Sequence, residues 1–200
     1  MSETESGPEL QPEDKARAAV YGLIARLFYA PPDAGVLAQL LHANAFEGSQ
    51  EPVALAWRAM VEAGRTAFPV VLENEHTELF VGTGKAEVTP YLTHYTIKYA
   101  NENPLVELRQ QLNRWGIGRR DSVNEPEDHI AGVCEAMRFA IAVQHRSLDE
   151  QKEFFERFLY RGATSLCDAV TASPKAIFYR QMAQFARAFF EVEREAFEML

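Results

Sequence analysis

The chain has 200 residues, 47% of them hydrophobic, which is enough to bury the core of one domain or of two small ones. Its 20 basic and 29 acidic residues leave a net charge of -9, which disfavours nucleic acid and anionic membranes as partners. The acidic start lacks the basic and apolar regions of a secretion signal, and no apolar run is long enough for a membrane span. These features predict a globular, cytoplasmic protein without membrane insertion.

The N-terminal part of the chain shows the three-and-four spacing of amphipathic helices. The first helix is expected from about residue 12 until Pro31, where proline stops it. A short second helix follows with Asp33 as its N-cap, and a third occupies about residues 52–68. A fourth helix carries Val71, Leu72, Leu79 and Phe80 and ends at Gly82.

A long loop separates these helices from the rest, because residues 82–94 hold two glycines and a proline without a sustained period. Helix returns at Asn103, which is expected to cap it, with Pro104 in the first turn and Gly116 at the end. Residues 116–124 then form a second irregular connection.

Three further helices complete the chain. The first has an apolar stripe from Ile130 to Ile141, and the second opens at Ser147 with a Ser-x-x-Glu capping box. The last is expected to start at Ser173 and Pro174 and to bury aromatic residues such as Phe185.

No segment shows the alternation of a strand, and no internal repeat is present. The predicted fold is therefore all-α, a single compact helical bundle of roughly eight or nine helices. The predicted organisation is a flexible acidic N-terminus at residues 1–11 and one all-helical domain at residues 12–200, with candidate hinges or loops at 82–94 and 116–124.

The sequence motifs that could indicate a cofactor or metal site are incomplete. Gly82-Thr-Gly-Lys85 lacks the first glycine and the final Ser or Thr of a phosphate-binding loop. Glu73-Asn-Glu-His76 has the spacing of a di-iron ligand pair, but no second copy exists, which favours a solvated helix face. The histidines do not cluster with Cys134 and Cys167, so two reduced, buried thiols, no metal site and no cofactor are expected.

One stretch, Glu125-Pro-Glu-Asp-His129, contains three carboxylates, a proline and a histidine in consecutive positions. Asn124 could cap the following helix, with Pro126 in its first turn and Glu127 completing a capping box. Capping does not explain His129, which when charged prefers a helix C-terminus. If the helix begins here, Glu125, Asp128, His129 and Gly132 share one face opposite the apolar stripe, which favours a docking surface.

This motif resembles the Glu-Pro-x-Asp-His motif of the TorD/DmsD family of redox-enzyme maturation chaperones. The segment from Glu78 to Gly84 with Pro90, Tyr91 and Tyr95 is similar to the family's Leu-Phe-x-Gly segment and the Pro-Tyr loop after it. Phe178-Tyr-Arg180 is similar to the start of its C-terminal helix. The chain departs from the family at Phe158-Leu-Tyr-Arg-Gly162, where a His and a Trp are common, and at Thr93, where Ser is usual.

The resemblance implies a non-catalytic cytoplasmic chaperone that binds the twin-arginine signal peptide of a molybdenum-cofactor oxidoreductase, of formate dehydrogenase or dimethyl-sulfoxide-reductase type. Its partners would be that peptide, the apo form of the catalytic subunit and, as further candidates, proteins of molybdenum-cofactor biosynthesis. Both a monomer and a swapped dimer fit. The implied peptide-binding residues are Glu125, Pro126, Asp128, His129, Tyr91, Tyr95 and Phe80.

Two alternatives remain open. The same residues could serve an assembly chaperone for a non-exported molybdoenzyme subunit of nitrate-reductase type. They could also belong to an enzyme that binds a small molecule, although no nucleophile or metal set converges in the sequence.

Overall fold

The computed structural model describes residues 10–43, 46, 48–82, 86–97, 99, 102–119 and 124–200. Most of the predicted flexible N-terminus, part of the Gly82-Thr-Gly-Lys85 segment and residues 120–123 of the predicted connection at 116–124 lie outside these residues. Within them the chain is all-α and contains no β-strand, as predicted; the single β-type pairing is an isolated bridge between Tyr91 and His129.

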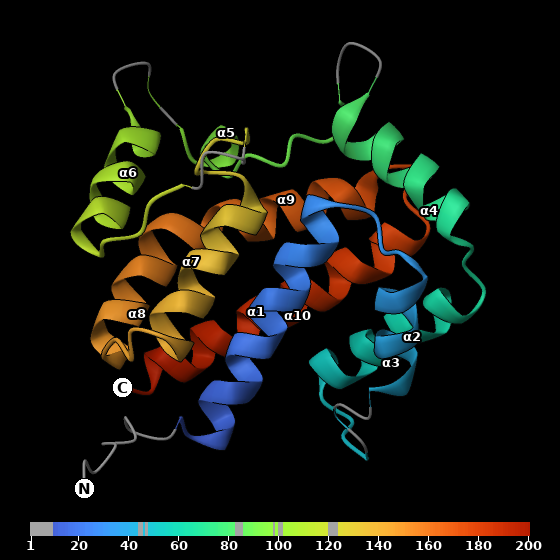
Figure 1. Ribbon diagram of the computed structural model, residues 1–200, viewed down its shortest axis with the longest axis horizontal. Helices are drawn as coiled ribbons and strands as arrows, with labels where there is room; N and C mark the ends of the chain where they lie inside the picture. Colours follow the sequence, from blue (N-terminus) through green and yellow to red (C-terminus); the bar gives the residue numbers. More distant parts are fainter. Residues whose placement is uncertain are drawn as a thin grey trace, which may run out of the picture.

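The helices follow one another in the order shown in Figure 1. Their bounds are α1 (Pro12–Tyr29), α2 (Ala34–His42), α3 (Pro52–Arg65), α4 (Pro69–His76), η1 (Thr77–Val81), α5 (Thr93–Thr96), α6 (Pro104–Arg114), α7 (Ile130–Ala142), α8 (Leu148–Phe154), η2 (Phe155–Leu159), α9 (Tyr160–Ala172) and α10 (Phe178–Glu198). The two η segments are π-helical and run on without a break from α4 and from α8, respectively.

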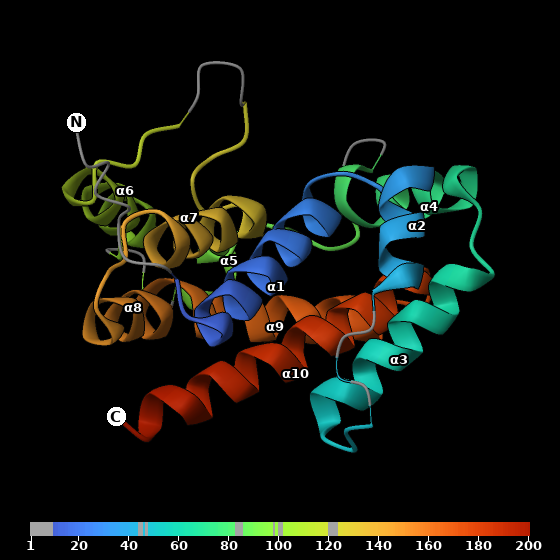
Figure 2. The ribbon, with the colours of Figure 1, turned by 60° about the horizontal axis from the view of Figure 1, so that its bottom comes forward.

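Two long helices organise the bundle. α1 packs along α7, while α10 packs on α3 and α9, and Figure 2 shows α10 extending beneath α1 and α9. α4 and α6 lie at the margins of the molecule in Figure 1. None of the helices in the described part of the chain combines the length and the apolarity that a bilayer crossing requires.

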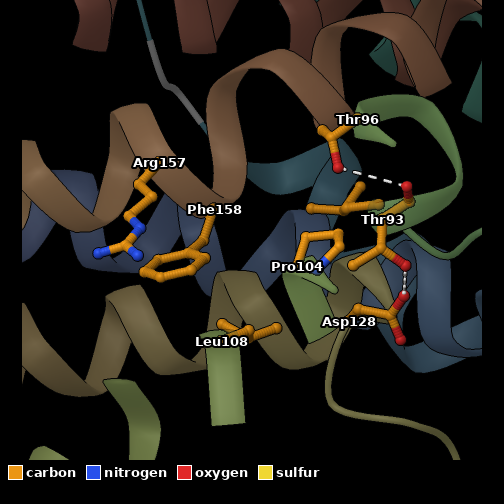
Figure 3. A pocket seen from close by; sticks show the side chains of 8 residues that line it. Thr93, Thr96, Pro104, Leu108, Asp128, Arg157 and Phe158 are labelled. Carbon is orange, nitrogen blue, oxygen red and sulfur yellow. Dashed lines mark hydrogen bonds between the residues drawn. The ribbon is translucent and has the colours of Figure 1, made fainter. Parts of the chain in front are cut away.

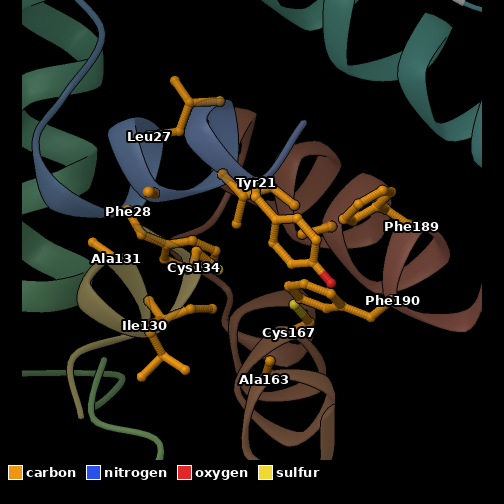
Figure 4. Packing of buried hydrophobic residues seen from close by; sticks show 14 of the residues in the cluster. Tyr21, Leu27, Phe28, Ile130, Ala131, Cys134, Ala163, Cys167, Phe189 and Phe190 are labelled. Carbon is orange, nitrogen blue, oxygen red and sulfur yellow. The ribbon is translucent and has the colours of Figure 1, made fainter. Parts of the chain in front are cut away.

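The core is a single aromatic-rich cluster between α1, α7, α9 and α10 (Figure 4). The ring of Tyr21 lies edge-on to Phe189 at 5.0 Å between centroids, and Trp57 packs on Phe185 at 5.1 Å. Cys134 and Cys167 are both free thiols buried in this cluster, as predicted.

Several helix ends agree with the sequence analysis. Asp33 caps α2 by accepting the backbone N–H of Val36 at 2.9 Å, and Ser147 and Glu150 form the predicted capping box of α8. Gly116 follows α6 with a positive φ of 67°, which glycine adopts at little cost.

Two predicted helix starts were wrong in detail, and one predicted side-chain cap is not formed. The last helix begins at Phe178, because Ser173 and Pro174 form a turn in which the Ser173 hydroxyl accepts the N–H of Lys175. Asn103 precedes α6 but makes no side-chain cap. The helix after the acidic motif begins at Ile130, not at the motif itself.

Candidate functional site

A strap formed by residues 88–97 crosses the N-terminal end of α7. The backbone N–H of Leu92 donates to the carbonyl of Asp128 at 2.8 Å, and the N–H of Ile130 donates to the carbonyl of Pro90 at 2.9 Å. These two bonds bring Tyr91 opposite His129. The structure thus joins the acidic motif to the Pro-Tyr loop, two segments that the sequence analysis assigned to one surface.

Asp128 lies under the strap and is only 4% exposed. Its Oδ2 accepts a hydrogen bond from the hydroxyl of Thr93 at 2.5 Å. Figure 3 shows this pair at one end of a small hollow whose volume is about 10 Å³, the room for about one water molecule. The hollow is lined by Leu92, Thr93, Thr96, Pro104, Leu108, Asp128, Arg157 and Phe158. Asp128 therefore holds the strap in place and presents almost no surface for docking.

His129 is the N-cap of α7 and is 6% exposed. Its Nδ1 accepts the backbone N–H of Ala131 at 3.1 Å, a bond that requires Nδ1 to be unprotonated. Burial lowers the pKa of His129, which favours the neutral ring that this cap needs. The capping function assigned to Asn124 and Glu127 was therefore wrong: His129 performs it.

The residues before the cap form a turn, in which the N–H of His129 donates to the carbonyl of Pro126 at 3.1 Å. Glu125 and Asp128 consequently do not share a helical face with His129, contrary to the prediction. Gly132 is exposed, but the carbonyl oxygen of Glu127 lies 3.2 Å from where its Cβ would be. The protein's own turn thus occupies part of the space beside Gly132 in which another chain was expected to dock.

The ring of His129 contacts two tyrosines. Tyr29 and Tyr91 both meet it edge-on, with centroid distances of 6.3 Å and 5.7 Å. Tyr29, the last residue of α1, is 50% exposed and was not among the predicted site residues. The sequence offered no signal for it, because it sits at the end of an ordinary amphipathic helix.

Glu125 provides the accessible charge of this site. Its half-buried carboxylate accepts the hydroxyl of Tyr91 at 2.7 Å, and this hydrogen bond raises the pKa of Tyr91 to about 12. Tyr29, Tyr91 and Glu125 therefore form a surface of two aromatic rings and one carboxylate above the buried His129. We call these three residues the Tyr-Glu surface.

The two remaining predicted residues support the site from inside. The hydroxyl of Tyr95 donates to the carbonyl of Thr89 at 2.8 Å, and burial raises the pKa of Tyr95 to about 12. Phe80 is buried against Phe28, His76 and Tyr179, with centroid distances of 5.2 to 5.6 Å. An apolar segment of a partner could not lie on Phe80 without opening the core.

A buried polar pair on α4 was not predicted from the sequence. Glu75 and His76 are both buried, so the solvated face expected for Glu73 to His76 was wrong except at its exposed polar members Glu73 and Asn74. His76 Nε2 lies 3.3 Å from the carbonyl of Phe28, and burial lowers the pKa of His76. This contact joins α4 to the last turn of α1, directly beside Tyr29.

In the described residues, no three His, Cys, Asp or Glu side chains come together in a group that could hold a metal ion. The geometry offers hydrogen bonding, a carboxylate and aromatic rings, which suit recognition of a cation.

Comparison with known proteins decides the family. The family described as "Nitrate reductase delta subunit" matches residues 47–191, well over half of the chain. The chain belongs to this family. The membership confirms the resemblance to TorD-type redox-enzyme maturation proteins.

Relatives within and around the family agree with this assignment. The chain is 31% identical over 103 residues to the chaperone protein TorD of Photobacterium profundum, a match that spans about half of each protein, 46% of this chain and 48% of that one. It is 27% identical to the TorD of Shewanella loihica, over 92% of this chain and 94% of that one.

A solved structure has the same fold. The crystal structure of a putative redox enzyme maturation protein from Archaeoglobus fulgidus aligns with a TM-score of 0.58 over 94% of this chain and 99% of that one. Its sequence identity of 16% makes this a likeness of fold alone.

Proposed function

We propose that this member of the nitrate reductase delta subunit family is a cytoplasmic, non-catalytic chaperone for redox-enzyme maturation. It binds the twin-arginine signal peptide of a molybdenum-cofactor oxidoreductase, of formate dehydrogenase or dimethyl-sulfoxide-reductase type. In doing so it holds the apo catalytic subunit until the cofactor is inserted. Family membership and the names of the TorD relatives support the chaperone role.

The Tyr-Glu surface is the observation that supports a cationic ligand. A guanidinium group can stack on tyrosine rings and pair with a carboxylate in the same site. Tyr29 and Tyr91 supply the rings, both in edge-on contact with His129, and Glu125 supplies the charge. The net charge of -9 adds long-range attraction for a basic peptide.

The other residues of the motif have positioning roles in this proposal. Pro126 shapes the turn, Asp128 anchors the strap through Thr93, and His129 caps α7 and contacts both tyrosines. Tyr95 fixes the strap from its inner side, and Phe80 supports the end of α1 through Phe28.

Calorimetric titration with a synthetic peptide that carries two adjacent arginines and then an apolar stretch tests the proposal. Glu125→Gln keeps the size of the side chain but removes its charge, and a charge-assisted contact is worth about 1.5 to 3 kcal/mol. We expect the variant to bind at least about tenfold more weakly at low salt. Glu156→Gln, at an exposed glutamate on η2, is the matched control and should bind as the unmodified protein does. Equal affinity of Glu125→Gln and the unmodified protein would contradict the role of this surface.

Replacing both arginines of the peptide by lysine distinguishes the contribution of the planar guanidinium group from that of its positive charge. Lysine keeps the charge but lacks the planar group that stacks on tyrosine. Stacking on the Tyr-Glu surface would be supported if the unmodified chain binds the lysine peptide more weakly than the arginine peptide, while Tyr29→Leu binds the two peptides equally. The same loss of affinity in both proteins would contradict it.

A second candidate is assembly of a non-exported molybdoenzyme subunit, which the description of the family favours. This candidate predicts binding to the apo catalytic subunit without measurable binding to the twin-arginine peptide. Sedimentation of the chain with each of the two ligands distinguishes the proposals.

A further inference from the structure

Two of the aromatic residues that the resemblance implied for peptide binding offer little surface to the apolar part of a client peptide. Phe80 is buried, and the hydroxyl of Tyr95 is bonded to Thr89 within the strap. A different apolar surface lies nearby, on the outer side of α4 and η1. We define the α4 outer face as Phe68, Val70, Val71, Glu73, Glu78 and Val81.

The apolar members of this face are exposed to an extent unusual for large side chains in a monomer. Phe68 is 69% exposed, Val70 62% and Val81 60%. Val70, Asn74, Thr77 and Val81 follow helical spacing on the side opposite the buried Leu72, His76 and Phe80. Figure 1 shows α4 at the margin of the molecule.

The charged members of the face are carboxylates only. Residues 68–81 contain no lysine or arginine, and neither Glu73 nor Glu78 forms an ion pair with any residue that the structure describes. Two cations flank the start of α10 beside α4, and both have other partners: Lys175 is 3.8 Å from Glu87, and Arg180 donates to the carbonyl of Ser173 at 2.9 Å. The face therefore combines apolar contact with unpaired negative charge.

These properties select one kind of occupant. A second copy of the chain that met this face symmetrically would set carboxylates against carboxylates, and anionic lipid or nucleic acid would be repelled. A segment that carries both apolar and basic side chains matches the face on both counts.

The face is linked to the Tyr-Glu surface through the end of α1. His76 of α4 contacts the carbonyl of Phe28, and the next residue, Tyr29, contacts His129. We infer that the α4 outer face binds the apolar stretch of the client peptide whose arginines occupy the Tyr-Glu surface, an inference that rests on the proposed function. One peptide would then bind both surfaces, with its arginine pair on the Tyr-Glu surface and its apolar stretch on the α4 outer face.

Titration of two peptides against three proteins tests the inference. The first peptide has two adjacent arginines and an apolar stretch, and the second has serines and glycines in place of that stretch. The proteins are the unmodified chain, Val70→Ser/Val81→Ser and the control Val143→Ser/Val192→Ser, which changes exposed valines on α7's C-cap and on α10.

We expect the unmodified chain and the control to bind the first peptide about tenfold more tightly than the second. Val70→Ser/Val81→Ser should bind both peptides with equal, weaker affinity. If this variant keeps full preference for the first peptide, the inference is overturned while the proposed function stands. If the unmodified chain binds neither peptide, the proposed function fails and the inference fails with it.

Two further measurements guard against a variant that folds poorly. Glu73→Gln/Glu78→Gln should weaken binding of the first peptide at low salt, whereas Glu13→Gln/Glu156→Gln, at exposed glutamates elsewhere, should not. Hydrogen exchange on the unmodified chain should show slower exchange across residues 69–82 when the first peptide is added, and less slowing with the second. Unchanged exchange in this segment would overturn the inference without any substitution.

Discussion

The carboxylate of Glu75 accepts a hydrogen bond from the backbone N–H of Tyr179, 2.8 Å away and 104 residues later in the chain. It also accepts the N–H groups of Ile177 at 2.7 Å and Phe178 at 3.2 Å. The first N–H groups of a helix have no partner within the helix and carry a partial positive charge. A carboxylate at this end accepts their hydrogen bonds and interacts favourably with the helix dipole. Glu75 thus fixes the start of α10 to α4.

Replacing this buried carboxylate by an amide should be costly. Glu75→Gln presents an NH2 group to backbone donors and removes the charge, so we expect the free energy of unfolding to fall by about 1 to 3 kcal/mol. Glu73→Gln, two residues away and exposed, should change it by less than about 0.5 kcal/mol. Urea unfolding followed by circular dichroism measures both, and similar values for the two variants would contradict this role of Glu75.

The strap is held against α9 by a close approach at Gly162. A Cβ at this position would lie 2.8 Å from Leu92 Cβ and 2.9 Å from the carbonyl oxygen of Leu92. Gly162→Ala should therefore displace the strap and lower the free energy of unfolding by about 1 to 3 kcal/mol, despite the better helix propensity of alanine.

Gly118→Ala is the control for that substitution, since nothing lies within 4 Å of a Cβ there. Thermal melting of the two variants makes the comparison. If Gly162→Ala keeps the original melting temperature, the strap can move to accommodate the methyl group without a loss of stability.

The neutral ring of His129 predicts a dependence of stability on pH. Its pKa is lowered in the folded protein by burial, while the nearby Glu125 and Asp128 act in the opposite direction. The unfolded chain therefore binds the proton first, and the free energy of unfolding should fall as pH drops below about 6.5, by at most about 1.4 kcal/mol per pH unit for one proton.

His129→Asn tests this dependence, because asparagine is a good N-cap but does not titrate. Urea unfolding at pH 7 and pH 5 should show a smaller loss of stability for the variant than for the unmodified chain. Some loss should remain, since burial lowers the pKa of His76 as well. An identical pH dependence in both proteins would exclude His129 as its source.

A partly buried ion pair, in which the carboxylate is the buried member, joins α1 to α10. Arg17 Nε and Nη2 donate to the two carboxylate oxygens of Glu193 at 2.8 Å and 2.9 Å, and the Tyr21 hydroxyl donates to the same group at 2.9 Å. Arg17→Met leaves this carboxylate without its cation, so we expect a loss of about 3 kcal/mol in the free energy of unfolding.

Adding Glu193→Gln to Arg17→Met should restore part of the lost stability, because the buried charge is then gone as well. Arg138→Met, which breaks an exposed pair with Glu135, should cost no more than about 1 kcal/mol. A double variant less stable than Arg17→Met alone would refute this account.

The sequence predicted what depends on neighbours along the chain. The apolar periodicity identified the helical elements, and local caps at Asp33, Ser147 and Gly116 appeared as expected. It could not predict Glu75, because the N–H groups that this residue satisfies lie more than a hundred positions away. A polar Glu-Asn-Glu-His run looks solvated until the partner helix is known.

The acidic motif shows the same limit. Its residue types indicated a functional segment, and the structure does bring Tyr91 and Glu125 together. Burial of Asp128 and His129 depends on the strap that crosses them, a non-local contact that periodicity does not reveal. Histidine is also an unusual N-cap, so the start of α7 was placed too early.

The contact of His129 with both Tyr29 and Tyr91 has a consequence for the thermodynamics of binding. An arginine held by these rings would bring positive charge close to the imidazole and further favour its neutral form. Ligand and proton would then compete, so that each bound peptide expels a fraction of a proton near the pKa of His129. Calorimetry in buffers with different ionisation enthalpies would detect that release, and affinity would decline as the surroundings acidify.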